Sequence, residues 1–178
     1  VALSGLMRYR GTHFGPEFKD HLFVTEFNTH KVKRIALNRS GSTFAAEPME
    51  FLTCPDGDFH PTDVLEDADG SLLVIDTGAW FLNGCPTSRV AKPEVTGAIY
   101  RIRKTDGQLV NDPRGKKLDL KNANLSKLVY RLDDPRPAIR EQAMEGIAAH
   151  VNRRDSLNDD LKTLIRSKIE RLSQEKPL

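Results

Sequence analysis

Two segments of this sequence, 50 residues apart, repeat the same pattern. In each segment two apolar residues and then an acidic residue occupy every second position. They are Leu22, Val24 and Glu26 in the first segment, and Leu72, Val74 and Asp76 in the second. Each segment follows a turn and precedes a stretch rich in Ile and Arg, at 32–37 and 98–103. Because β-branched and alternating residues suit a pleated sheet, we expect repeated units of antiparallel strands.

A repeat of about 50 residues with about four short strands per unit is typical of β-propeller blades. The first unit is expected at 4–9, 21–27, 31–38 and 47–52. The second is expected at 62–66, 72–75 and 98–103, with a weak fourth strand near Leu109. The pattern therefore predicts a partial propeller of about two blades of antiparallel strands. A small antiparallel sandwich without a closed ring is the alternative.

The spacing of apolar residues changes after 105–117, a stretch dense in turn residues. Apolar residues then recur at helical spacing in three stripes, within 125–132, 139–151 and 161–172. Pro135 disfavours helical geometry at the residue before it, so the first helix is expected to end there. The chain is thus mostly β and then α, with a β domain at 1–112 and antiparallel helices at 113–178.

Charge and hydropathy argue against several classes of partner. The chain has 27 Lys and Arg against 25 Asp and Glu, a formal net charge of +2, so no strong field attracts nucleic acid or an anionic membrane. No apolar run approaches the ~20 residues of a membrane span. The sequence starts at Val1 without a signal-peptide pattern, and we interpret it as a piece of a longer protein.

The loops at one end of the second unit carry the candidate site residues. In a propeller, the loop entering the innermost strand and the loop joining the second and third strands lie on the same face. The second of these loops, 76–97, is longer than the usual ~4–6 residues, and long loops on a rigid scaffold often carry binding residues. The residues expected at this rim are His60, Asp63, Asp76, Trp80, Arg89 and Lys92.

His60 and Asp76 are the catalytic candidates. An imidazole acts as a general base near neutral pH, and Asp76 would hold it or help to ligate a hard cation. Asp63, Trp80, Arg89 and Lys92 are substrate-binding candidates, since basic side chains suit a carboxylate or a quinone oxygen. Each also has a structural interpretation: the His and Asp side chains bond nearby backbone, the tryptophan packs, and the basic groups are solvated.

Cys54 and Cys85 are the only cysteines of the chain. They form no CxxC motif, and no His or Cys cluster completes a zinc site, so the sequence assigns no metal. The propeller topology puts both at the same rim, where a disulfide would hold the long loop. Two free thiols are the alternative.

Several segments resemble one bacterial family. They are SGLMRYRG (4–11), HLFVTEFNTHKVKRIAL (21–37), GSTFAAEPMEFL (41–52), FHPTDVLEDADGSLLVIDTGAW (59–80) and the stretch 85–103. They are similar to the closing blades of proteins called membrane-bound dehydrogenases in planctomycetes and verrucomicrobia, whose propeller resembles that of glucose/sorbosone dehydrogenases. The segment LVYRLDDPRPAIREQAMEGIAAHV (128–151) resembles a HEAT repeat, with an Asp-containing turn followed by Arg140.

The resemblance implies a periplasmic or cell-surface quinoprotein that oxidises a sugar or alcohol. Pyrroloquinoline quinone (PQQ) and calcium are the implied cofactors of the longer protein, and electrons would pass to a haem domain outside this segment, which has no CxxCH motif. Most blades would precede Val1, so the rest of the propeller is the expected partner and the fragment alone is expected to be inactive. The alternative is a non-catalytic propeller and HEAT module that binds a polysaccharide or protein, because fold alone does not fix function.

Overall fold

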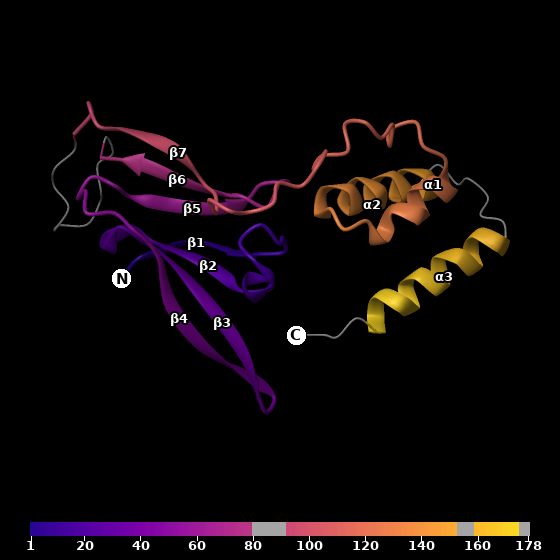
Figure 1. The fold of residues 1–178 in the computed structure, drawn as a ribbon, viewed down its shortest axis with the longest axis horizontal. Helices are drawn as coiled ribbons and strands as arrows, with labels where there is room; N and C mark the ends of the chain where they lie inside the picture. Colours follow the sequence, from indigo (N-terminus) through magenta and orange to yellow (C-terminus); the bar gives the residue numbers. More distant parts are fainter. Residues whose placement is uncertain (80–91, 153–158, 175–178) are drawn as a thin grey trace. The chain divides into compact units, whose positions relative to one another are not determined.

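The chain forms two compact units that follow each other in sequence. The computed structural model describes residues 1–79, 92–152 and 159–174. Unit 1 is Val1–Gln108 and contains all the described strands, whereas unit 2 is Leu109–Leu178 and contains the described α-helices (Figure 1). The predicted order of antiparallel sheets followed by helices is confirmed.

The first sheet of unit 1 is a four-stranded antiparallel meander. Its strands are β1 (Leu3–Arg8), β2 (Leu22–Glu26), β3 (Lys31–Ser40) and β4 (Thr43–Thr53), in this order. One 3₁₀ turn (Pro16–Phe18) lies between β1 and β2, and another (Phe27–Thr29) joins β2 to β3. At 10 and 11 residues, β3 and β4 are the longest strands described, and they form a ribbon that projects past β1 and β2 (Figure 1).

The second sheet has three antiparallel strands: β5 (Pro61–Glu66), β6 (Leu72–Gly78) and β7 (Thr96–Ile102). The weak fourth strand predicted near Leu109 is not formed among the described residues, so this prediction is wrong. The chain turns after β7, where the N–H of Gly107 donates to the carbonyl of Lys104. The imidazole of His13 then holds this turn: it accepts the N–H of Lys104 and lies 3.3 Å from the carbonyl oxygen of Gln108.

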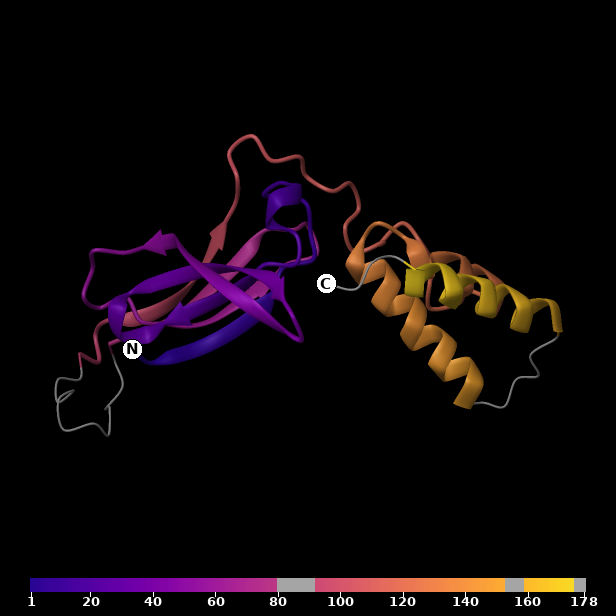
Figure 2. The same cartoon turned by 90° about the horizontal axis from the view of Figure 1, so that it is seen from below.

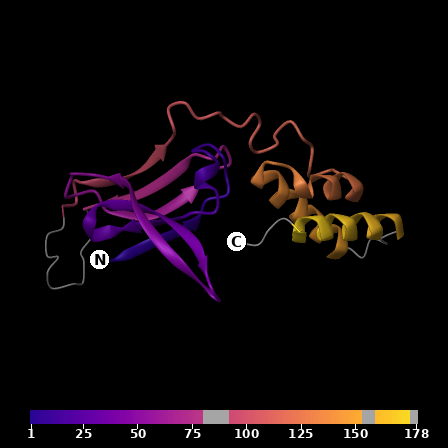
Figure 3. The same ribbon diagram turned by 60° about the horizontal axis from the view of Figure 1, so that its bottom comes forward.

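The hydrophobic core of unit 1 lies between its two sheets. Strand β5 packs against β1 and β2, and Figures 2 and 3 show the sheets packed together from two further directions. Both sheets contribute apolar residues to one cluster, because successive side chains of a strand point to opposite faces. Its buried members are Tyr9, Phe14, Phe23, Val32, Phe59, Val64, Leu72 and Val74.

Tyr9 gives this core a buried hydrogen bond. Its hydroxyl donates to the carbonyl of Gly70 at 2.8 Å, and its ring meets those of Phe14 and Phe23 edge to face. Burial is the main reason that the pKa of Tyr9 rises to about 12, since the phenolate would lose its hydration. The folded state therefore favours the protonated, neutral form of Tyr9.

Unit 1 is accordingly expected to lose stability in alkali through Tyr9. The raised pKa contributes stability that is complete below the unfolded pKa of 10.0 and is lost as pH rises through about 12. Replacing Tyr9→Phe should remove this dependence and cost about 1 kcal/mol at pH 7, because the carbonyl of Gly70 loses a donor. Urea unfolding at pH 7, 10 and 11 measures both effects. Equal slopes against pH in the two proteins would contradict the assignment.

The two sheets also carry apolar side chains on the faces turned away from this core. In the second sheet Leu65 pairs with Leu73 and Ile75 pairs with Ile99, while Leu65 and Ile99 are 44% and 68% exposed. In the first sheet Leu6 of β1 is 65% exposed. These outer faces therefore resemble sheet faces made for contact with further structure.

Unit 2 contains α1 (Leu125–Tyr130), a 3₁₀ turn (Arg131–Asp133), α2 (Pro137–Asn152) and α3 (Asp159–Gln174). They lie where the three apolar stripes were predicted. Asn124 caps α1 by accepting the N–H of Lys127 at 3.0 Å, the expected role of a short polar side chain at this position. Among the described helices, none has the length and apolar composition needed to cross a membrane.

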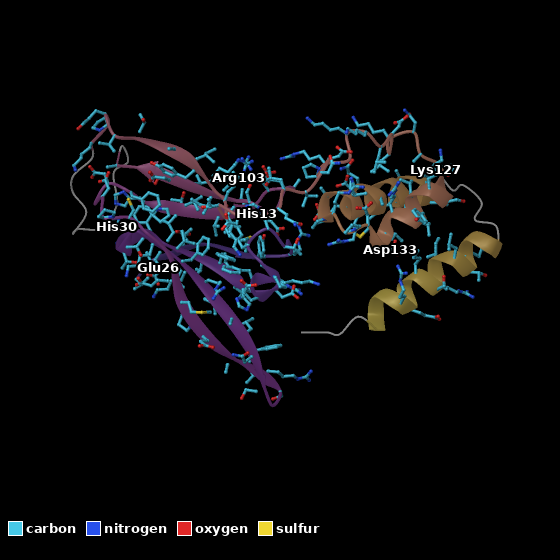
Figure 4. The ribbon with its side chains drawn as sticks, in the orientation of Figure 1. His13, Glu26, His30, Arg103, Lys127 and Asp133 are labelled. Carbon is cyan, nitrogen blue, oxygen red and sulfur yellow. The ribbon has the colours of Figure 1, made fainter. Side chains whose placement is uncertain are left out.

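The turn between α1 and α2 is built on the buried carboxylate of Asp134. Arg136 donates to it from Nε at 2.8 Å, Arg131 from Nη1 at 3.1 Å, and the N–H of Arg136 at 3.1 Å. The hydrogen bond from the Arg136 side chain is the main reason that the pKa of Asp134 falls to about 2. Next to it, Asp133 pairs with Lys168 of α3 at 2.6 Å, so the turn contacts all three helices (Figure 4).

Candidate functional site

One end of unit 1 brings together three of the six predicted site residues: His60, Asp76 and Lys92. We call this end the rim. Pro61 at the start of β5 pairs with Asp76 of β6, which places His60 beside the end of β6. His30 and Glu26 lie at this end as well, whereas His13 and Arg103 lie at the opposite end of the sheets (Figure 4).

The carboxylate of Asp76 binds backbone at the rim. Its Oδ1 accepts the N–H of His60 and the N–H of Gly78, both at 2.8 Å. These two bonds tie the entrance of β5 to the end of β6, where Gly78 adopts a φ of 63° that favours glycine. Asp76 thus contacts the main chain of His60 and not its imidazole, so the two side chains do not form a catalytic pair.

The imidazole of His60 is held by a neighbouring carbonyl. Its Nδ1 lies 3.0 Å from the carbonyl oxygen of Asp58, which only accepts, so Nδ1 carries the proton in this contact. The ring packs 4.7 Å from that of Phe27 and 5.3 Å from that of His30, centroid to centroid. These contacts hold the ring of His60 in place at the rim.

Lys92 is bound at the rim by an ion pair with Asp58. Its Nζ lies 2.7 Å from both carboxylate oxygens, and its N–H donates to the carbonyl of Ala79. The hydrogen bond to Asp58 is the main cause that raises the pKa of Lys92. The ammonium charge is therefore matched within the protein, which favours a role in holding the 56–60 segment.

Asp63 lies at the contact between β1 and β5. Its Oδ1 accepts the N–H of Val64 at 2.8 Å. A Cβ placed on Gly5 of β1 would approach the Cα and Oδ1 of Asp63 to 2.6 Å, so this close approach requires glycine. Asp63 thus lies where the two sheets pack closely against each other. The need for glycine at position 5 was not visible in the sequence pattern.

The remaining predicted residues are only partly covered by the structure. Trp80, Arg89 and Cys85 lie outside the described residues. Cys54 is partly buried beside the rim, and its N–H donates to the carbonyl of His30 at 3.0 Å. The Cys54–Cys85 disulfide therefore stays a prediction.

The two acidic residues of the 50-residue repeat, Glu26 and Asp76, each form hydrogen bonds within the hairpin to which they belong. Glu26 is buried, pairs with Lys33 at 2.8 Å and accepts the hydroxyl of Thr29 at 2.6 Å. The hydrogen bond from Lys33 is the main cause that lowers the pKa of Glu26. Asp76 occupies the corresponding position and binds backbone. The repeat in sequence is thus a repeat of hairpin-stabilising carboxylates.

A cavity of about 370 Å³ opens between the two sheets next to the rim. We call it the inter-sheet cavity. Sequence reasoning missed it because its walls come from three separate segments of the chain, 52–59, 74–76 and 95–102. It is lined by Leu52, Thr53, Cys54, Asp56, Asp58, Phe59, Val74, Asp76, Val95, Thr96, Tyr100 and Ile102.

The described residues do not supply a cluster of ligands for a metal ion. No described group of three or more His, Cys, Asp or Glu side chains is placed to hold a metal ion. Asp76, the predicted hard-cation ligand, instead directs one oxygen to two backbone N–H groups. No step through calcium or a quinone is therefore derived from these residues.

The fold and the site together describe a protein with two packed antiparallel sheets, a rim at which a carboxylate binds the backbone, and a helical unit. The DUF7133 domain, a domain of unknown function, matches residues 1–106, and the chain belongs to this family. The matched range corresponds closely to unit 1, which ends at Gln108. No curated protein and no solved structure matches the chain.

Proposed function

We propose that unit 1 forms the closing blades of a β-propeller. Two antiparallel meanders follow each other in the chain, and β5, the first strand of the second, lies against β1 and β2 of the first. The observation that carries the proposal is the pair of apolar outer faces, marked by Leu6, Leu65 and Ile99. A blade within a propeller has a neighbour on both faces, so further blades would cover these side chains.

Unit 2 supports the HEAT-like part of this proposal. Its first two helices, α1 and α2, contact each other and are joined by the Asp134 turn. Arg140 of α2 donates to the carbonyl of Asp134 at 2.8 Å and to that of Pro135 at 3.2 Å, so the arginine fixes the turn that precedes its own helix. This is the arrangement expected from the resemblance of 128–151 to a HEAT repeat.

We infer that the longer protein is a dehydrogenase-like oxidoreductase of the glucose/sorbosone type at the periplasm or cell surface. PQQ would supply the oxidant when bound, with calcium beside it and a haem domain beyond this chain as electron acceptor. The chain's own part is to build the rim: Asp76 fixes the entrance of β5, and Lys92 fixes the 56–60 segment. Both side chains are engaged in the protein, so the chemistry belongs to other blades and the 178-residue chain alone has no turnover.

Calorimetric titration of the longer protein with PQQ and calcium tests this proposal, together with sugar-dependent dye reduction. Binding and dye reduction are expected, and both should survive His60→Ala, because no reacting group is assigned to this rim. Failure of the wild-type protein to bind quinone and to reduce dye would contradict the quinoprotein assignment. Loss of both on His60→Ala, in a protein that still folds, would move the chemistry to this rim.

A non-catalytic module that binds polysaccharide or protein is the second candidate. The engagement of Asp76 and Lys92 in backbone and ion-pair contacts favours it, because neither side chain is left for catalysis in this segment. A glycan array probed with the longer protein distinguishes the two functions. Selective glycan binding in a protein without dye reduction would support the module.

A further inference from the structure

We propose that the inter-sheet cavity binds a small organic cation, an amine or quaternary ammonium that carries one apolar group. The cavity contains three carboxylates, Asp56, Asp58 and Asp76, and no Lys or Arg among its described lining residues. Lys92 matches the charge of Asp58 from outside the lining. Two negative charges therefore remain among the described lining residues, and charge complementarity favours a cation.

Asp76 makes this more than a cluster of acidic residues. It is only 8% exposed, yet it lines the cavity. Its Oδ1 is occupied by the N–H groups of His60 and Gly78, whereas none of the described residues donates to Oδ2. This Oδ2 is not among the enclosed, unpartnered side-chain atoms of the described residues, so it reaches the open space of the cavity, where it can accept a hydrogen bond from a ligand.

Asp56 repeats this arrangement at the exposed edge of the cavity. Its Oδ1 accepts the N–H of Asp58 at 2.9 Å, and no described residue donates to its Oδ2. Both carboxylates thus use one oxygen to brace the local backbone. The other oxygens provide two acceptors fixed by the fold, which suits the N–H groups of an amine or the positive surface of a quaternary ammonium.

The apolar wall of the cavity determines the other half of the ligand. Tyr100 is half-exposed, and its ring meets that of buried Phe59 edge to face at 5.9 Å. An aromatic face beside carboxylates attracts organic cations through the ring quadrupole, and Val74 adds apolar surface. A volume of about 370 Å³ lies at the lower end of the range for small-ligand sites, so the ligand is small.

Titration of the full 178-residue chain with benzyltrimethylammonium tests the proposal, with benzyl alcohol and benzoate as neutral and anionic probes of similar size. Saturable binding is expected for the cation alone. The changes in amide chemical shift that the cation causes in an NMR spectrum should be largest at Gly78 and Tyr100 and in the residues around them. Since this cavity is not the central channel of a propeller, cation binding does not depend on the proposed oxidoreductase function.

Asp76→Asn separates the ligand contact from the fold. The amide oxygen can still accept the N–H groups of His60 and Gly78, while the charge facing the cavity is removed. Affinity for the cation should fall about tenfold or more, the scale of a charge-assisted contact. Tyr100→Leu should also weaken binding. Asp63→Asn is the matched control, because it removes a carboxylate that does not line the cavity.

Four outcomes would overturn the proposal. Three of them are no saturable binding of the cation, equal binding of benzyl alcohol, and equal loss of affinity in Asp76→Asn and Asp63→Asn. A monosaccharide that binds at Asp76 in place of the cation would also overturn it, and would point to hydroxyl recognition at the same acceptors. Unchanged quinone binding in the longer protein together with cation loss in Asp76→Asn would show that the two sites are separate.

Discussion

Replacing Phe23→Ala is expected to lower the free energy of unfolding of unit 1 by about 4 kcal/mol. The side chain of Phe23 is fully buried between the two sheets, and its ring lies 4.9 Å from that of Phe51 and 5.9 Å from that of Tyr9. Truncation removes the transfer free energy of the ring and leaves a cavity that strands from two sheets cannot close. The loss is a large fraction of the ~5–15 kcal/mol typical of a domain.

Urea unfolding followed by far-UV circular dichroism measures this loss. Phe44→Ala is the matched control, because Phe44 lies near the tip of the β3–β4 ribbon and is half-exposed. Its truncation should change the free energy of unfolding by less than about 0.5 kcal/mol. Similar losses in the two variants would show that the core does not lie between the sheets.

Replacing Asp134→Asn is expected to destabilise unit 2 by about 3 kcal/mol at pH 7. The amide retains one acceptor for the N–H of Arg136, but the guanidinium groups of Arg131 and Arg136 lose their counter-charge. Breaking a buried pair on one side costs more than the pair contributes, because the remaining charges stay partly desolvated. Asp119→Asn is the control, since exposed Asp119 bonds only Asn122 among the described residues.

The same carboxylate should make unit 2 sensitive to acid. The folded pKa of Asp134 is about 2, against 3.8 for the unfolded group. A depressed pKa contributes stability that is present above 3.8 and is lost as pH falls through about 2; the contribution is about 2 kcal/mol. The helical signal measured in urea between pH 5 and 2 should therefore fall in the wild type and in Asp119→Asn, and should change less in Asp134→Asn. Identical profiles would contradict the role of Asp134.

The sequence predicted the strands and helices because their signals are local. Alternating apolar residues mark one face of a strand whatever the neighbouring strands do. Leu72 and Val74 lie in the core, whereas Leu22 and Val24 share the face of β2 opposite to the core residue Phe23. The ribbon was longer than predicted, since 38–43 is polar and has little strand propensity. There β3 and β4 pair across the turn at Gly41, whose φ is 62°, and pairing of the backbone outweighs propensity.

The site was less accessible to sequence reasoning, because its contacts join distant segments. Asp76 was expected to serve a side chain, whereas it accepts two backbone N–H groups, and no local pattern distinguishes these partners. The prediction of a strand near Leu109 was wrong for a similar reason, because His13, over 90 residues away in the sequence, binds the turn that follows β7. The inter-sheet cavity forms only when the three segments that line it come together in the fold.

The β3–β4 ribbon has a dynamic consequence. At about 3.4 Å per residue, the 10 residues of β3 reach twice as far as the five of β2, so about half of the ribbon has no third strand beside it. The outer rungs, 37–46, carry side chains that are mostly exposed. Opening there breaks few contacts, so these amides should exchange with deuterium well before those of β2 and β6. The tip should therefore open and close while the rest of unit 1 stays folded.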